Sequence, residues 1–292
     1  MSSQILARLQ VAAAAVLFST GGVAIKATQA TGWTVSGLRA GIAGVVLLLF
    51  LPGAAKHLRL VRVWVVAVPY AATVTMFVLS SKYTTAANAI FLQNTAPLYV
   101  LLLGPLLLKE AVRRRDAFYM GALVLGLLVI IVGRAPAQAT ASNPDLGNLL
   151  AVCGGVSWAL TIVGMRWLSR DTSSNASLAA VIVGSLLALL VALPSMGSLG
   201  SLGANDWLLL GYLGVLQIGL AYVLLTRGMR VVSAFNAALL LLIDPVLTPL
   251  WVWLFLNEAP GWVPLIGGAV IIGASALHIF SESTVKTVAE FD

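Results

Sequence analysis

Two amide side chains, Gln93 and Asn94, stand in a long apolar stretch one helical turn before Pro97. Proline has no backbone N–H and frees a carbonyl group one turn upstream, so a kink is expected beside the two amides. Polar side chains in so apolar a segment usually face a cavity or a neighbouring helix. We therefore interpret Gln93 and Asn94 as lining a ligand cavity, in preference to bridging two helices.

A carboxylate, Asp244, directly precedes Pro245 in a second apolar stretch, and Thr248 follows one turn later on the same helix face. A carboxylate at this depth has three candidate roles. It can bind the ammonium group of a substrate, hold a proton, or close a structural ion pair with Arg39 or Arg166. The residues alone leave these roles open.

Aromatic side chains near the same segments can offer a ring face to an apolar substrate group. For any one of them alone, packing between helices is the simpler interpretation. The four candidates are Tyr83, Tyr99, Trp158 and Tyr222.

Side chains that carry out covalent or metal-assisted catalysis are scarce. The chain has two histidines, His57 and His278, and one cysteine, Cys153, and it shows no metal-ligand spacing, phosphate-binding loop or Ser-His-Asp set. We therefore predict no catalytic residue, no metal and no cofactor, and a membrane-embedded enzyme is a remote alternative. Cys153 is interpreted as a small packing residue.

Composition determines which elements position these side chains. Of the 292 residues 60% are hydrophobic and 9% are charged, so lipid must surround much of the chain. A membrane-spanning helix needs about 20 apolar residues, and the alternating pattern of a barrel is absent. Ten helices are predicted, at residues 9–26, 34–51, 63–82, 85–108, 117–133, 146–168, 177–193, 207–229, 233–256 and 261–280.

Basic residues gather in alternate connections between the apolar stretches. With the amino terminus in the cytoplasm, most of them lie on the cytoplasmic side, and only Lys26, Lys82 and Arg134 fall outside. This positive-inside bias predicts that both termini are cytoplasmic. Membrane orientation therefore accounts for the net charge of +7, and no nucleic-acid partner is expected.

A repeat relates the two halves of the chain at a constant offset of 148 residues. The matched pairs are Asn88 with Asn236, Pro97 with Pro245, and Glu110 with Glu258. Because each unit contains an odd number of helices, the two units run in opposite directions through the membrane. We predict an all-α protein of two inverted five-helix repeats, residues 1–140 and 141–292, around a central cavity.

The repeated segments resemble the EamA-type five-helix unit of the drug/metabolite transporter superfamily. In that unit the fourth helix ends with a proline and then a glutamate, and a glycine-rich helix follows. The residues that carry this resemblance are Pro97, Glu110 and Gly121, and again Pro245, Glu258 and Gly268. The segment Phe91 to Pro97 is most similar to the bacterial aromatic amino acid exporters of the YddG type.

This resemblance implies a secondary transporter in the bacterial inner membrane that exports small metabolites, foremost neutral and aromatic amino acids, by alternating access. Pro97 and Pro245 would be the hinges of its gates. The expected partners are membrane lipid and the small-molecule substrate, and the chain is expected to act as a monomer. Because similar units serve other cargoes, export of nucleotide sugars or cationic drugs is the alternative.

The charge pattern makes a topological prediction. A reporter enzyme fused after Arg114 or to the carboxyl tail is expected to lie in the cytoplasm, and one inserted near Gln138 or Gly200 is expected to lie outside. Reporters that are active on only one side of the membrane measure this. A cytoplasmic reporter near Gln138 would contradict the inverted repeat.

Overall fold

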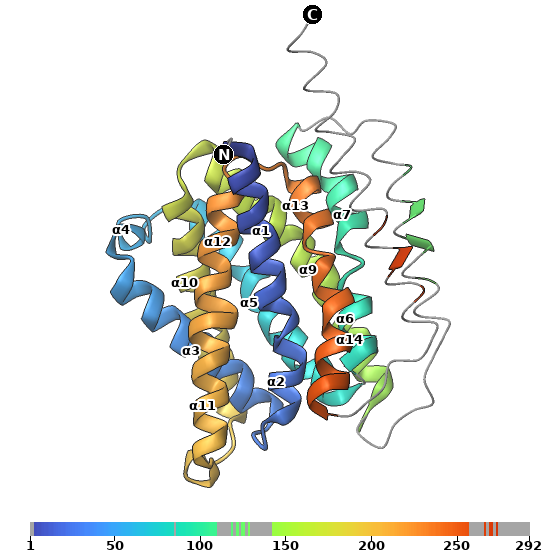
Figure 1. Ribbon diagram of the computed structural model, residues 1–292. Coiled ribbons are helices and arrows are strands. Elements are labelled where there is room, and N and C mark those ends of the chain that lie inside the picture. Colours follow the sequence, from blue (N-terminus) through green and yellow to red (C-terminus); the bar gives the residue numbers. More distant parts are fainter. Residues whose placement is uncertain are drawn as a thin grey trace, which may run out of the picture.

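The computed structural model describes residues 3–84, 86–109 and 142–256, with single positions at 118, 121, 122, 124, 125, 128, 266, 269, 270 and 273. Every regular element in these ranges is a helix, and the long helices stand side by side (Figure 1). Eight helical segments are long and apolar enough to cross a membrane. Because a helix satisfies its own backbone hydrogen bonds, such segments are stable in lipid. The protein is therefore a multi-pass helical membrane protein.

Several segments contain more than one element, because a turn or a wider helix interrupts them. The first half has α1 (Ser3–Ser19), α2 (Gly21–Ala27), α3 (Gly32–Phe50), α5 (Val61–Tyr83), α6 (Ala86–Gln93), α7 (Ala96–Leu103) and the π-helix η1 (Gly104–Leu108). The second half has α9 (Pro144–Asp171), α10 (Ser174–Ala192), α11 (Ala204–Tyr212), the π-helix η4 (Leu213–Leu220), α12 (Ala221–Gly228), α13 (Ala234–Leu240) and α14 (Ile243–Leu256). The short helices α4 (Pro52–Ala55), η2 (Leu193–Ser195) and η3 (Leu199–Ser201) lie in connections.

Eight of the ten predicted helices are found, with ends that differ by a few residues. The largest difference is at the amino terminus, where α1 begins at Ser3 instead of Leu9. Its first two turns contain the polar residues Ser3, Gln4 and Arg8, and a hydropathy pattern gives no signal where a helix continues beyond the apolar layer. The predicted helices at 117–133 and 261–280 lie almost wholly outside the described residues.

The predicted helices over 85–108 and 233–256 are present, and a turn divides each of them at the place where a kink was expected. The turns fall at residues 94–95 and 241–242, just before Pro97 and Pro245. Each proline leaves the carbonyl group four residues earlier without its helical donor, which favours a break there. The offset of 148 carries the first turn onto the second within one residue, so the sequence repeat is also a repeat of structure.

The predicted helix over 9–26 is divided as well, at Thr20 between α1 and α2. No proline is present, but Gly21 and Gly22 follow the turn, and glycine weakens a helix at any interior position. Thr20 Oγ1 lies 2.7 Å from the hydroxyl oxygen of Tyr212 on α11. The turn therefore brings a polar group of the first half into contact with the second half.

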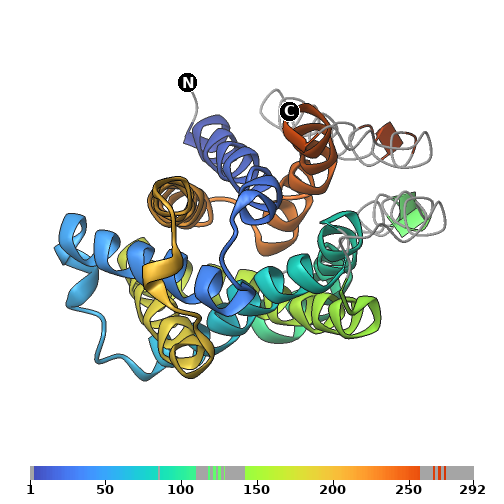
Figure 2. The same ribbon diagram turned by 90° about the horizontal axis from the view of Figure 1, so that it is seen from below.

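Close packing against α10 holds α5 in place. A Cβ atom on Gly184 of α10 would lie 2.7 Å from the carbonyl oxygen of Ala67 and would overlap the ring of Tyr70. Tyr70 is fully buried, and its hydroxyl lies 3.1 Å from Ser185 Oγ. Viewed along the bundle, α1, α12 and α14 stand on one side of the interior, with α9 and α10 on the other (Figure 2).

Replacing Gly184 with alanine should therefore weaken the fold. The added methyl group has no space against Tyr70 and Ala67, and overpacking of this kind costs about 1–3 kcal/mol. Thermal unfolding of the purified protein measures the effect. The matched control is Gly211→Ala, because a Cβ there would meet nothing within 4 Å. Equal melting temperatures for the two variants would contradict this account of the α5–α10 contact.

Candidate functional site

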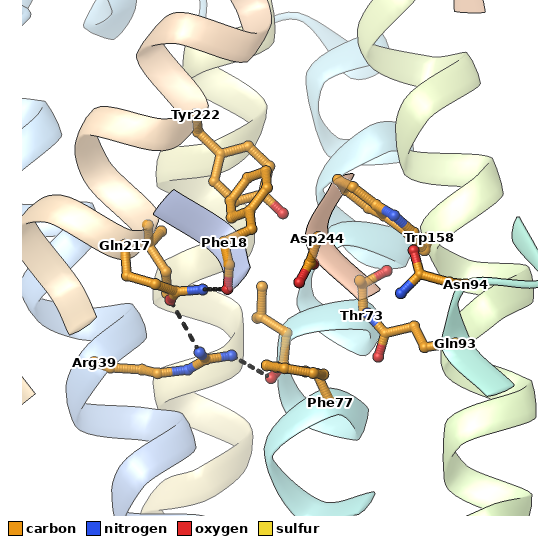
Figure 3. A pocket seen from close by; sticks show the side chains of 12 residues that line it. Phe18, Arg39, Thr73, Phe77, Gln93, Asn94, Trp158, Gln217, Tyr222 and Asp244 are labelled. Carbon is orange, nitrogen blue, oxygen red and sulfur yellow. Dashed lines mark hydrogen bonds between the residues drawn. The ribbon is translucent and has the colours of Figure 1, made fainter. Parts of the chain in front are cut away.

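A cavity lies inside the bundle, and both halves of the chain line it (Figure 3). It is bounded by α1, α3, α5, α6, α9, η4, α12 and α14. The lining residues are Phe18, Arg39, Thr73, Val74, Phe77, Gln93, Asn94, Trp158, Gln217, Ile218, Tyr222 and Asp244. The cavity therefore combines a cation, a carboxylate, amides and aromatic rings in one space.

Arg39 brings a positive charge into this space from α3 and is only 2% exposed. Its Nη1 donates to Oε1 of Gln217 over 3.2 Å, and its Nη2 donates to the carbonyl oxygen of Val74 over 2.9 Å. The guanidinium carbon also lies 5.6 Å from the ring centre of Phe77, within the range of a cation–π contact. These groups are all neutral, so they hold the guanidinium without neutralising its charge.

Gln217 reaches Arg39 from the π-helix η4. Its amide links two elements, because Oε1 accepts from Arg39 while Nε2 donates to the carbonyl oxygen of Phe18 over 3.4 Å. A Cβ atom on Gly21 would lie 2.6 Å from Nε2, so glycine at that position leaves room for the amide. π-Helical turns are rare and occur frequently at functional sites.

Asp244 lies in the first turn of α14 and is tied to α1 through Thr248. Oγ1 of Thr248 is 2.9 Å from Oδ1 of Asp244, 3.0 Å from the backbone oxygen of Asp244 and 3.1 Å from that of Ser19. A hydroxyl group has one proton to donate, so it serves one of these acceptors at a time. The carboxylate is therefore held weakly and remains able to accept from a ligand.

The structural ion pair considered for Asp244 is absent from the described part of the chain. Arg39 donates to Gln217 and Val74, and the guanidinium of Arg166 donates to the carbonyl oxygens of residues 229 and 230 near the end of α12. In Figure 3 the carboxylate of Asp244 lies between the Arg39–Gln217 side and the Gln93–Asn94 side. The ion pair is thus not formed in this structure, and the two charges stay separate.

Aromatic rings form one wall of the cavity. The ring centre of Phe18 lies 5.0 Å from that of Tyr222 and 6.1 Å from that of Trp158, both in edge-to-face geometry. Tyr222 also contacts Tyr70 behind it, at 4.9 Å. Edge-to-face contacts fix the ring orientations, so this wall presents a rigid apolar surface.

The amides of Gln93 and Asn94 lie at the turn between α6 and α7. Nδ2 of Asn94 donates to the carbonyl oxygen of Ile90 over 2.7 Å, so this amide partly serves its own helix end. Oε1 of Gln93, in contrast, is buried and has no hydrogen-bond partner. A buried acceptor without a donor is unfavourable unless something else supplies one. Gln93 is thus a candidate ligand-binding residue.

The structure brings five of the predicted substrate residues together and leaves the others outside the cavity. Gln93, Asn94, Trp158, Tyr222 and Asp244 line it. The remaining predicted residues are half-buried Tyr83 at the end of α5, half-buried Tyr99 in α7, buried Thr248 behind Asp244, and the buried prolines Pro97 and Pro245 at the two helix breaks. The prolines therefore shape the backbone beside the cavity without lining it.

Sequence reasoning missed Phe18, Thr73, Phe77 and Gln217, and considered Arg39 only as a partner for Asp244. A usable signal existed for Gln217 and Arg39, since both are polar residues deep in apolar stretches, as Gln93 is. No such signal exists for Phe18 and Phe77. Cys153, predicted as a packing residue, is exposed on the face of α9 that also carries the exposed Val152 and Val156.

The arrangement suits noncovalent binding. Within the described residues, no group of three or more His, Cys, Asp or Glu side chains lies close enough to hold a metal ion. The cavity instead offers a fixed guanidinium, a carboxylate, a free amide oxygen and an aromatic wall. These groups can orient a small molecule that carries both charges and an apolar part.

Comparisons with known proteins agree with this architecture. The family model of the EamA-like transporter family matches twice, at residues 5–132 and 145–280. The crystal structure of another protein superposes with a TM-score of 0.76 at 23% identity, covering 96% of this chain and 98% of that one. This likeness concerns the fold alone.

Curated relatives are transporters by name. An uncharacterized transporter of Archaeoglobus fulgidus is 28% identical over 66% of this chain and 67% of its own length. The pseudopaline exporter CntI of Pseudomonas aeruginosa is 27% identical over 64% of each chain. The uncharacterized transporter YyaM of Bacillus subtilis is 22% identical over 59% of this chain and 58% of its own length. The matches thus span about three fifths to two thirds of these relatives.

The double match of the family model covers most of the chain and places one copy on each half. Each copy contributes side chains to the cavity. The chain belongs to the EamA-like transporter family.

Proposed function

We propose that the protein is a secondary carrier that exports small metabolites, foremost neutral and aromatic amino acids, by alternating access. The observation that supports this most is that Arg39 and Asp244, which do not pair with each other, both line one cavity beside an aromatic wall, with side chains from both halves around it. A neutral amino acid carries one negative and one positive charge and often an apolar side chain. Each of these parts has a complementary group in the cavity.

The alternative cargoes fit the same groups less well. A cationic drug would be attracted by Asp244 but repelled by Arg39. A nucleotide sugar, which is anionic, would be attracted by Arg39 but repelled by Asp244. Inside protein, where the effective dielectric constant is lower than in water, a like charge without a compensating partner is strongly unfavourable. The name of one relative, a pseudopaline exporter, supports export of a small metabolite.

We further propose ten membrane-spanning helices in two inverted repeats, residues 1–140 and 141–292. The two helix breaks related by the offset of 148 support this division. The basic residues of the alternate connections support an orientation with both termini in the cytoplasm, in the inner membrane of a bacterium. The carrier would act as a monomer, would need no cofactor and would draw its energy from a solute or ion gradient.

Two helical hairpins, α5–α6 joined near Tyr83 and α12–α13 joined near Val231, are suitable gates for the two faces. At the end of α5, the carbonyl oxygen of Tyr83 accepts from the backbone N–H of Asn143 over 3.1 Å, and Thr84 donates to the side chain of Asn148 over 3.0 Å. These bonds join the α5–α6 hairpin to the start of α9 in the other half. They would break when that face opens, while the broken helices allow the segments to bend beside the cavity.

Transport itself is tested with purified protein in liposomes. Uptake of a panel of labelled neutral amino acids should exceed that of protein-free liposomes, with the aromatic ones among the substrates, and each should cross unchanged. Selectivity should be loose, because an apolar wall discriminates by only about 1–3 kcal/mol per methylene group. Flux of nucleotide sugars or cationic drugs without flux of any amino acid would contradict the proposal, and appearance of a chemical product would indicate an enzyme.

The hinge role of the prolines makes a separate prediction. Replacing Pro97 or Pro245 with alanine restores a backbone donor, so the broken helix should straighten and exchange between outward-open and inward-open states should slow. Transport rate at matched expression should fall several-fold, and the accessibility of introduced cysteines on each face reports which state accumulates. Trp207→Phe serves as the control, since Trp207 is half-exposed at the start of α11. Normal transport by both proline variants would make them packing residues only.

A further inference from the structure

Two opposite charges share the cavity, and neither is neutralised by the other. Arg39 donates to neutral acceptors and Asp244 accepts from a neutral donor, and within the described residues neither forms an ion pair. Charges buried in protein are normally paired, because removing an ion from water is costly. Both charges in the cavity thus lack the partner that would compensate them, and a ligand with the opposite charges can supply it.

Hydrogen-bonding groups without a partner lie beside the two charges as well. Nε of Arg39 is buried without a partner, and the guanidinium uses only two of its five N–H groups in the bonds described above. On the side of the cavity beyond Asp244, Oε1 of Gln93 is a buried acceptor without a donor. A spare donor therefore accompanies the cation, and a spare acceptor lies beyond the carboxylate.

We propose that the cavity binds a zwitterion in one fixed orientation. The carboxylate of the substrate takes hydrogen bonds from Arg39, and its ammonium group donates to Asp244 and to Oε1 of Gln93. The apolar part of the substrate then packs against the wall of Phe18, Trp158 and Tyr222. This inference rests on the proposed function, because it assumes that the cavity is the site where the cargo binds.

The hydrogen bonds that hold Arg39 determine how its guanidinium is oriented toward the carboxylate of the substrate. Gln217 and the carbonyl oxygen of Val74 each take one N–H from a different terminal nitrogen, which fixes the plane of the guanidinium. A planar guanidinium fixed in this way can donate two parallel hydrogen bonds to a carboxylate. On this account Gln217 is a positioning residue, and Arg39 is the residue that contacts the substrate.

Such a site requires both charges of its ligand. A ligand that lacks its carboxylate leaves the buried charge of Arg39 uncompensated, and a ligand that lacks its ammonium group leaves the half-buried charge of Asp244 uncompensated. Sites built to bond a substrate group discriminate strongly against analogues without it, because their own polar groups remain unpaired. The zwitterionic form itself is then the main determinant of specificity, ahead of the identity of the side chain.

Three probes separate the two charges at constant ring size: L-phenylalanine, 2-phenylethylamine, which lacks the carboxylate, and 3-phenylpropanoate, which lacks the ammonium group. Calorimetric titration of the purified full-length protein measures binding of each. The wild-type protein should bind phenylalanine at least about tenfold more tightly than either analogue, the factor expected for a charge-assisted hydrogen bond.

Variants then assign each charge to its residue. In Asp244→Asn the preference for phenylalanine over 3-phenylpropanoate should fall by about tenfold, while in Arg39→Gln the preference over 2-phenylethylamine should fall instead. A merely destabilised protein would lose affinity for all three probes alike, so the change in preference is the decisive readout. The matched controls Asp145→Asn and Arg59→Gln remove the same charges at exposed positions outside the cavity and should leave both preferences unchanged.

The outcomes distinguish this inference from the proposed function. Equal wild-type affinity for all three probes, or unchanged preferences in both cavity variants, would overturn the zwitterion site even if amino acids cross the membrane. Binding with the expected preferences but no amino acid flux in liposomes would overturn the carrier function and leave the site. Absence of binding for every probe would overturn both.

Discussion

The charge of Arg39, buried in the centre of a membrane-spanning bundle, is the constraint on which the arrangement of the cavity depends. A guanidinium there needs protein groups in place of water, and three neighbours provide them. Val74 contributes a carbonyl oxygen, Gln217 an amide oxygen and Phe77 a ring face. Because these residues come from α5 and η4, holding one charge determines how three helices of both halves meet.

Irregular backbone supplies the remaining polar contacts of the site. The carbonyl oxygen of Phe18 accepts from Gln217, and that of Ser19 accepts from Thr248, both just before the turn at Thr20. The two proline-associated turns place the Gln93–Asn94 pair and Asp244 beside the same space. In membrane proteins, backbone that departs from regular helix is tolerated where it is buried in protein or lines a cavity. The helix breaks are therefore part of the site.

Sequence reasoning located part of this site for a physical reason. Gln93, Asn94 and Asp244 are polar residues in apolar stretches, and the repeat placed two prolines beside them, so their shared position followed from the high cost of polar groups in lipid. Tyr83 and Tyr99 were predicted to line the cavity and lie outside it. Helices that are apolar on every face give no periodic signal that would show which face points into the bundle.

Other features needed coordinates. No proline lies near the turn at Thr20 to indicate it in the sequence, and the π-helix around Gln217 has no sequence signature. The distance that keeps Arg39 on α3 apart from Asp244 on α14 also depends on how helices of the two halves pack against one another. Local patterns determine which segments become helices, whereas long-range packing determines their rotation and therefore which side chains meet.

The central claim, that this cavity is the path of the cargo, is tested most directly by a cysteine placed within it. In a Cys153→Ser background, Thr73→Cys puts a thiol of similar size on the lining. In protein that still transports, a small water-soluble thiol reagent should label this cysteine from either face of the membrane, and saturating phenylalanine should slow the labelling. A cysteine that stays unlabelled from both faces, or that labels at the same rate with substrate present, would contradict the account.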